Sequence, residues 1–218
     1  TYVDGQVDGT FTWSSTLTQD PIVFGAGLYP GFESYDFNGH ISNVRISDIA
    51  RYTGSFTPST ENFTSDANTK LLTFQKNRFI DESSIGNTFT FTGTPEISAF
   101  NPFGQESEYA AGENKGSTYF DGSGDYIDTN TPSNIGTADF TIEAWVYPTN
   151  VSNNESFIVQ GSFGTGSFQL RFESGELSFD YGNGNKLQGS TVTTANQWYH
   201  VAVTRTNGTV YIWLDGQL

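Results

Sequence analysis

Residues 199–214 decide the fold class, and their sequence is Tyr199-His-Val-Ala-Val-Thr-Arg-Thr-Asn-Gly-Thr-Val-Tyr-Ile-Trp-Leu214. Apolar and polar residues alternate on both sides of Asn207-Gly208, which is typical of two strands that each bury one face. Asn and Gly adopt positive φ at low cost, as the type I′ turn of a tight hairpin requires. This stretch therefore predicts an antiparallel β-hairpin.

Short alternating runs of the same kind recur along the chain between Gly, Asn, Asp and Pro residues. Residues Phe140 to Ala144 alternate cleanly, and Pro148 ends the run. Residues 168–179 predict a second hairpin, and residues 119–127 predict a third that turns at residues 121–125. Helical periodicity is absent, so the sequence predicts an all-β fold.

The composition excludes several classes of protein. The 218 residues include 9 Lys and Arg against 24 Asp and Glu, a formal net charge of -15 at pH 7. That balance excludes a binder of the nucleic-acid phosphate backbone, because such affinity comes from clustered cations. The absence of Cys excludes disulfides, thiolate-held zinc and thiol catalysis. No apolar run approaches the ~18 residues of a membrane-spanning helix, so we expect no membrane insertion.

The chain contains a match to itself. Thr1-Tyr-Val-Asp-Gly-Gln-Val7 matches Ile212-Trp-Leu-Asp-Gly-Gln-Leu218 at an offset of 211, and the chain has no Met. Similarity at a fixed spacing is the signature of repeats, so we expect one period of a tandem array. On this hypothesis residues 1–68 are the C-terminal part of one repeat, and residues 69–218 are the N-terminal part of the next.

Several segments together resemble the concanavalin A-like, laminin G-type jelly-roll family. Their order and spacing match as well as their residues, and the segments are Phe37–Ile46, Ala50–Pro58, Tyr119–Ile127, Asp139–Pro148, Gln197–Arg205 and Leu214–Gly216. The Ala-Arg-Tyr-Thr and Phe-Thr-Pro elements of Ala50–Pro58, with Asn101-Pro-Phe103, are similar to modules in structural proteins of marine bacteriophages, cyanophages especially.

The family resemblance implies an antiparallel two-sheet sandwich whose first and last strands lie side by side, with ligands at the concave face or the rim loops. Two arrangements follow from the repeat hypothesis. Residues 1–68 complete the sandwich of 69–218 as a circular permutant joined through Thr53–Asn68, or each part belongs to a neighbouring repeat. An isolated half would expose sheet edges, so we expect completion within the chain or by a neighbouring copy.

The residues for catalysis are not present in the expected pattern. Glucanases of this superfamily carry acid and nucleophile on one strand, at Glu-x-Asp-x-x-Glu or Glu-x-Asp-x-Glu spacing. Here Glu143 stands alone, and Asp81 and Glu82 would point to opposite faces of a strand. The only histidines, His40 and His200, are accompanied by no Gly-x-Ser-x-Gly motif. We therefore expect no enzymatic activity.

One acidic loop offers carboxylates at alternating positions. Asp121, Asp125 and Asp128 would suit a calcium-binding loop. The alternative is a turn without a metal, in which Gly122 and Gly124 take positive φ. Laminin G relatives often hold calcium near a rim, with Gly-x-Ile-Asp-Glu in the closing strand. This chain has Gly-His-Ile-Ser-Asn at residues 39–43, without those acids. Calcium is thus the one cofactor that the sequence suggests.

Aromatic residues on the predicted strands are candidates for carbohydrate binding. Sugars present apolar CH faces that stack on aromatic rings, while amides bond to their hydroxyl groups. Each ring has the alternative role of filling the core, because aromatic side chains bury large apolar areas. The candidate rings, with two rim amides, are Trp145, Tyr147, Trp198, Tyr211, Trp213, Asn183 and Asn185.

Taken together, these patterns predict a non-catalytic binding or assembly module at a virion surface or outside the cell. The leading hypothesis is a phage structural protein (a tail fibre, appendage or capsid decoration) that contacts cell-surface carbohydrate, copies of itself or other virion proteins. The alternative is a repeat module of a bacterial or algal surface adhesin. A glycan-active hydrolase is disfavoured by the missing carboxylate pair.

Overall fold

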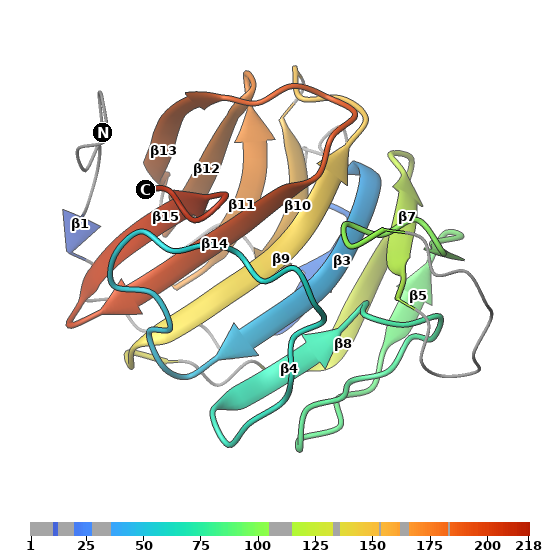
Figure 1. Cartoon of the computed structure of the whole chain (residues 1–218), viewed down its shortest axis with the longest axis horizontal. Helices are drawn as coiled ribbons and strands as arrows, with labels where there is room; N and C mark the ends of the chain where they lie inside the picture. The colour runs from blue at the N-terminus through green and yellow to red at the C-terminus, as the bar shows by residue number, and fades with distance from the viewer. Residues whose placement is uncertain are drawn as a thin grey trace.

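The computed structural model describes residues 11–12, 20–27, 36–104, 115–132, 136–152, 154–161, 166–182 and 184–218. These residues form fifteen strands in two antiparallel sheets, with no helix among them. Figure 1 shows the two sheets as stacked layers. The predicted all-β jelly-roll sandwich is confirmed.

The larger sheet has eight strands. Its spatial order is β1 (Phe11–Thr12), β15 (Thr209–Leu214), β14 (Tyr199–Thr206), β9 (Phe140–Pro148), β3 (Asn38–Ser47), β7 (Ser117–Asp121) and β6 (Glu96–Ser98), with β4 (Thr69–Thr73) paired to the end of β3. The seven-stranded sheet has the order β13 (Asn185–Val192), β12 (Glu176–Tyr181), β11 (Phe168–Glu173), β10 (Glu155–Gln160), β2 (Pro21–Phe24), β8 (Tyr126–Pro132) and β5 (Thr90–Thr92).

Phenylalanine is the most frequent residue in the core between the sheets. On β9, Phe140 and every second residue after it point into the core, so Trp145 and Tyr147 lie on the opposite, outer face with Glu143. Core rings meet edge to face, as Phe24 and Phe74 do with centroids 5.0 Å apart. The alternation of Ala144 to Val146 is apolar in both registers, so only the sheet packing decides which face is inside.

Two of the three predicted hairpins are confirmed, and one is wrong. β14 and β15 pair across Asn207 and Gly208, whose φ values are 50° and 78°, and β11 pairs with β12. The expected hairpin at residues 119–127 does not form, because β7 and β8 belong to different sheets. The buried carboxylate of Asp125 accepts hydrogen bonds from the backbone of Thr94 and Asp121, which fixes residues 121–125 as a crossing between the sheets.

The described part of residues 1–68 supplies one interior strand to each sheet. β3 lies between β9 and β7, and β2 lies between β10 and β8. In this structure, strands of the same chain therefore complete the sandwich. The assignment of residues 1–68 and 69–218 to two successive repeats remains a prediction.

Residues 48–68 cross the outer face of the eight-stranded sheet, over β14 and β9 (Figure 1). Their backbone meets the turn after β15, where the amide of Phe56 donates to the carbonyl of Gly216 at 2.9 Å. Gly216 has a φ of 74°, and a Cβ there would overlap the carbonyl oxygen of Phe56. We call residues 48–68 the covering segment.

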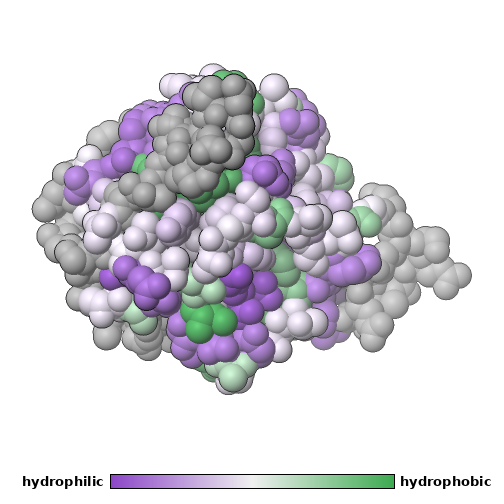
Figure 2. Space-filling view, turned by 60° about the vertical axis from the view of Figure 1, so that its left-hand side comes forward, coloured by the Kyte–Doolittle hydropathy of each residue, from purple (hydrophilic) through white to green (hydrophobic). Residues whose placement is uncertain are grey.

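Part of the molecular surface can be described directly. On the face shown in Figure 2, the patches of apolar residues are small, and hydrophilic residues surround them. In the described part of the chain, no helix has the length and apolarity needed to cross a membrane.

The close approach of Gly216 to the covering segment predicts a large effect of Gly216→Ala. The added methyl group forces the covering segment away from the turn, and the left-handed backbone is strained for alanine, so we expect a marked loss of stability. The matched control is Gly54→Ala, since a Cβ there meets nothing within 4 Å. Urea unfolding of both variants is the measurement, and equal midpoints would contradict this packing.

Candidate functional site

A buried carboxylate joins the eight-stranded sheet to the covering segment. Glu143 on β9 is 0% exposed, and Arg45 on β3 donates from Nε to its Oε1 at 2.7 Å. The other oxygen, Oε2, accepts the hydroxyl of Tyr52 at 2.7 Å and faces Nε2 of His200 at 3.3 Å. Since an ionised carboxylate can only accept hydrogen bonds, the imidazole of His200 carries a proton on Nε2 and donates it in this contact.

The electrostatics of this cluster keep Glu143 charged. Burial alone would raise the pKa of the Glu143 carboxyl, but the His200 hydrogen bond and the charge of Arg45 outweigh it, so its pKa lies below the ordinary value. Burial, followed by the Glu143 charge, raises the pKa of the Tyr52 phenol. Tyr52 therefore remains a neutral donor at neutral pH. Both oxygens of Glu143 are occupied by donors of the protein itself.

Aromatic rings enclose the cluster from the side of the covering segment. Phe56 stacks on Tyr52 with centroids 3.5 Å apart, and Phe63 lies under the guanidinium of Arg45 at 4.2 Å. The imidazole of His200 is 0% exposed and meets Phe56 edge to face at 5.6 Å. The cluster thus fastens the covering segment to the sheet.

A second group of aromatic side chains lies farther along the same outer face, beyond the covering segment. It consists of five rings in mutual contact, which we call the aromatic patch: His40, Phe100, Tyr119, Tyr147 and Trp198. Phe100 packs against Tyr147 at 4.8 Å and against Trp198 at 5.2 Å. β3, β7 and β9 each contribute one ring, and the loops before β7 and β14 contribute the others.

The patch is accessible and partly polar. Phe100 is 36% exposed, and the other four rings are half-buried. Burial lowers the pKa of His40 to about 4, so its ring is neutral at pH 7, and its Nδ1 lies 3.0 Å from the hydroxyl of Ser117. The indole nitrogens of Trp198 and of the adjacent Trp145 are buried and have no hydrogen-bond partner in the described structure.

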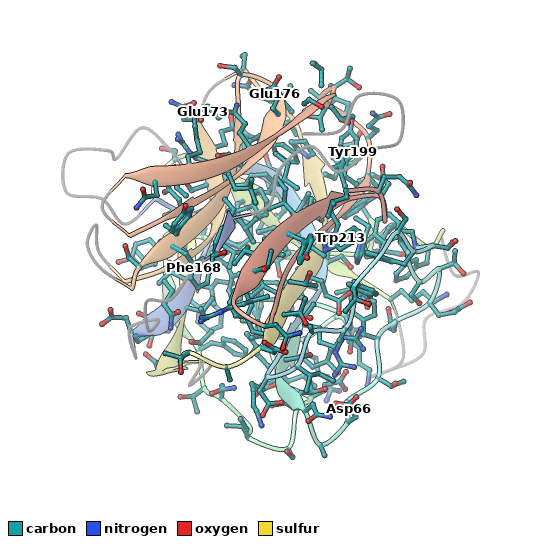
Figure 3. The ribbon with its side chains drawn as sticks, turned by 90° about the vertical axis from the view of Figure 1, so that its left-hand side faces the viewer. Asp66, Phe168, Glu173, Glu176, Tyr199 and Trp213 are labelled. Carbon is teal, nitrogen blue, oxygen red and sulfur yellow. The ribbon has the colours of Figure 1, made fainter. Side chains whose placement is uncertain are left out.

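The structure brings together three of the aromatic residues that the sequence singled out and separates two. Tyr147 and Trp198 contact each other at 5.5 Å, and Trp145 lies on the same face of the same strand as Tyr147. Tyr211 and Trp213 lie together on β15, away from the patch. Trp213 is only 1% exposed and donates to Thr204 at 2.9 Å, so its ring fills space beneath the covering segment (Figure 3).

The remaining predicted residues are not brought to the patch. Asn185 is exposed at the start of edge strand β13, and Asn183 lies outside the described residues. Sequence reasoning missed His40, Phe100 and Tyr119 as members of the patch. The alternation of β3 indicated that His40 faces away from Ile41, but no local signal places Phe100 against Tyr147.

The three aspartates proposed as calcium ligands have other partners. Asp121 accepts the amide of Ser123, and Asp128 accepts the amide of Asn130, each at 2.7 Å. Asp125 caps backbone amides, and Asp121 and Asp128 lie on strands of different sheets. Among the described residues, no group of three or more His, Cys, Asp or Glu side chains is arranged to hold a metal ion. The geometry favours the turn interpretation.

The outer face of the seven-stranded sheet carries a polar network that the sequence reasoning did not identify. Arg171 forms an ion pair with Asp180 at 2.8 Å, and Asp180 also accepts Gln169 and Ser178 at 2.8 Å each. Glu173 pairs with Lys186 at 2.7 Å, and Figure 3 shows it near the end of the β11–β12 hairpin. Because these groups largely satisfy one another, the network stiffens the sheet.

At one rim, a carboxyl group is held near neutrality. Glu155 is 4% exposed and accepts the amide of Asn38 at 3.1 Å. Burial is the dominant cause that raises the pKa of Glu155 to about 7, although this hydrogen bond opposes it. The contact ties β10 of one sheet to β3 of the other.

Comparison with known families agrees with the geometry. Residues 121–218, a little under half of the chain, match the family model of the concanavalin A-like lectin/glucanases superfamily. Over these residues the chain is similar to that superfamily. No curated protein and no solved structure matches the sequence. The laminin G-like resemblance of the sequence is thus confirmed at the level of the superfamily.

Replacing Glu143 by alanine is expected to destabilise the fold strongly. Arg45 and Tyr52 would be left without their buried acceptor, which costs about 3–5 kcal/mol in comparable ion pairs. Glu61 is a matched control, because its ion pair with Lys115 is exposed and Glu61→Ala should change stability by less than about 1 kcal/mol. Chemical denaturation distinguishes the two, and a Glu143→Ala variant as stable as Glu61→Ala would refute the role of the cluster.

The raised pKa of Glu155 predicts a pH-dependent stability. The unfolded chain releases this proton near the ordinary value, whereas the folded chain releases it at about 7. The stabilising contribution of the Glu155 carboxyl group is therefore fully present at pH values below its pKa in the unfolded chain. It is lost as the pH rises to about 7. As the pH rises over this interval, the free energy of unfolding of Glu155→Gln should increase relative to that of the original protein, by at most about 3 kcal/mol. Parallel stability curves from pH 4 to pH 8 would count against this assignment.

Proposed function

We propose that this protein is a non-catalytic carbohydrate-binding module whose aromatic patch receives the sugar. The observation that carries the proposal is the set of five contacting rings, half-exposed on the outer face of the eight-stranded sheet. The superfamily match over residues 121–218 supports a binding module of this general type.

The chemistry of the patch suits an uncharged sugar. Pyranose rings present CH groups that stack on aromatic faces such as those of Trp198 and Tyr147. His40 is neutral at pH 7 and adds no charge. With a net charge of -15, the chain disfavours polyanionic glycans through long-range repulsion.

The non-catalytic assignment rests on the carboxylates. Glycoside hydrolysis needs two carboxyl groups that flank the scissile bond. Glu143 is the acidic residue of β9, and both of its oxygens bond to protein donors in a site with no exposure. The proposal therefore excludes a role for Glu143 as acid or nucleophile.

We place this module on a virion or outside a cell. The leading assignment is a phage structural protein (a tail fibre, appendage or capsid decoration) that contacts host glycans or neighbouring subunits. The resemblance of Ala50–Pro58 and Asn101–Phe103 to marine phage modules supports it. The second assignment is a repeat module of a bacterial or algal adhesin, which uses the same patch.

A glycan array probed with the purified chain tests the binding function. We expect binding that falls at least tenfold in Trp198→Ala and in Tyr147→Ala, because each removes a stacking surface. Tyr211→Ala is the matched control, since Tyr211 is a half-buried aromatic residue on the same face but outside the patch. Circular dichroism verifies folding. Binding that survives both patch variants, or silence on all glycans, would reject the proposal.

A further inference from the structure

The loop that follows β6 lies on the aromatic patch and supplies one of its rings. Phe100 packs against Trp198, with ring centroids 5.2 Å apart and an angle of 32° between the ring planes. Phe100 also meets Tyr147 edge to face at 4.8 Å and His40 at 5.0 Å. Trp198 and Tyr147 are the rings that the proposed function assigns to sugar stacking. Phe100 therefore takes up ring surface that a sugar would contact.

The same loop also contacts the neighbouring indole. Phe103, three residues after Phe100, meets the ring of Trp145 at 5.7 Å, and Nζ of Lys115 lies 5.7 Å from the Phe103 ring. The indole nitrogens of Trp145 and Trp198 are buried, and neither has a hydrogen-bond partner in the described structure. A buried N–H group without a partner costs free energy, and such groups are rare in folded proteins. The loop thus rests against both indoles whose donors are unpaired.

The hydrogen bonds of this loop stay within it and its link to β6. Asn101 accepts the amide of Phe103 at 2.9 Å and donates to the carbonyl of Ala99 at 2.9 Å. The amide of Phe100 donates to the side chain of Ser98 at 3.1 Å. Among the described residues, no hydrogen bond joins residues 99–103 to β9 or β14. Ring contacts hold the loop on the patch, so it can move away as a unit without breaking a hydrogen bond to that surface.

We propose that residues 99–103 are a displaceable cover of the sugar-binding surface, in which Phe100 occupies the position that the ligand takes. This inference rests on the proposed function of the patch. Displacement of the loop makes the ring surfaces of Tyr147 and Trp198 available, and it frees the indole donors of Trp198 and Trp145 to pair with hydroxyl groups. A ligand must replace the ring contacts of the loop, so the cover favours molecules that combine an apolar face with adjacent hydroxyl groups.

Phe100→Ala tests the competition between loop and ligand. If the open form is populated at about 10% or less, the cover lowers the apparent affinity about tenfold or more, and its removal abolishes this cost. We therefore expect Phe100→Ala to bind neutral oligosaccharides about tenfold more tightly than the original protein, measured by calorimetry with cellohexaose, laminarihexaose and mannohexaose. The matched control is Phe91→Ala, because Phe91 is 45% exposed on β5, outside the patch. Weaker or unchanged binding by Phe100→Ala would overturn the cover.

Exchange of the indole protons tests the cover in the protein without a ligand. The internal control is Trp213, whose indole is buried and donates to Thr204. In NMR spectra of the indole N–H groups, we expect the protons of Trp145 and Trp198 to exchange with solvent faster than that of Trp213. Phe100→Ala should accelerate the exchange of Trp198 about tenfold and leave Trp213 unchanged. Exchange of Trp198 as slow as that of Trp213, or unaffected by Phe100→Ala, would refute the cover.

The two experiments separate this inference from the function on which it rests. If none of the three oligosaccharides binds but the indole protons exchange as expected, the sugar function fails and the loop is retained as a cover of the patch. If oligosaccharides bind and Phe100→Ala weakens them, the sugar function is retained and the cover is rejected. Circular dichroism verifies that both variants are folded.

Discussion

The buried carboxylate of Glu143 is the constraint on which the rest of the outer face depends. A charge with no exposure is tolerated only when donors surround it, and here they come from β3, β14 and the covering segment. Because Tyr52 must reach Glu143, the covering segment is held across the sheet and brings Phe56 to the carbonyl of Gly216. One ionised group in the middle of a strand thus fixes both the segment and the turn that follows β15.

The same constraint divides the outer face into a sealed part and an accessible part. Under the covering segment, His200 and Trp213 are buried, so these residues hold the fold together. Beyond it, the rings around Tyr147 and Trp198 remain partly exposed. On the seven-stranded sheet, polar side chains bond to one another through Asp180 and its partners. The aromatic patch is therefore the surface best suited to a ligand.

The hairpin turn at Asp215 and Gly216 connects the end of β15 to the covering segment. The turn directs the chain back along the β15 edge, and its position is secured by the covering segment. Among the described residues, β1 pairs with β15 at two positions.

The fold class and the hairpins at Asn207-Gly208 and Ser174-Gly175 could be predicted from the amino-acid sequence, because alternation and turn chemistry are local properties of adjacent residues. The superfamily was indicated by the resemblance of sequence segments, not by these local properties. It misjudged residues 119–127, where a hairpin and a crossing between sheets share the same turn residues. The packing of the sheets and of the covering segment sets the outward direction of Trp145, the burial of Trp213 and the place of Phe100 in the patch. These outcomes depend on which strands become neighbours and on what covers each face, and residues distant in the sequence settle both.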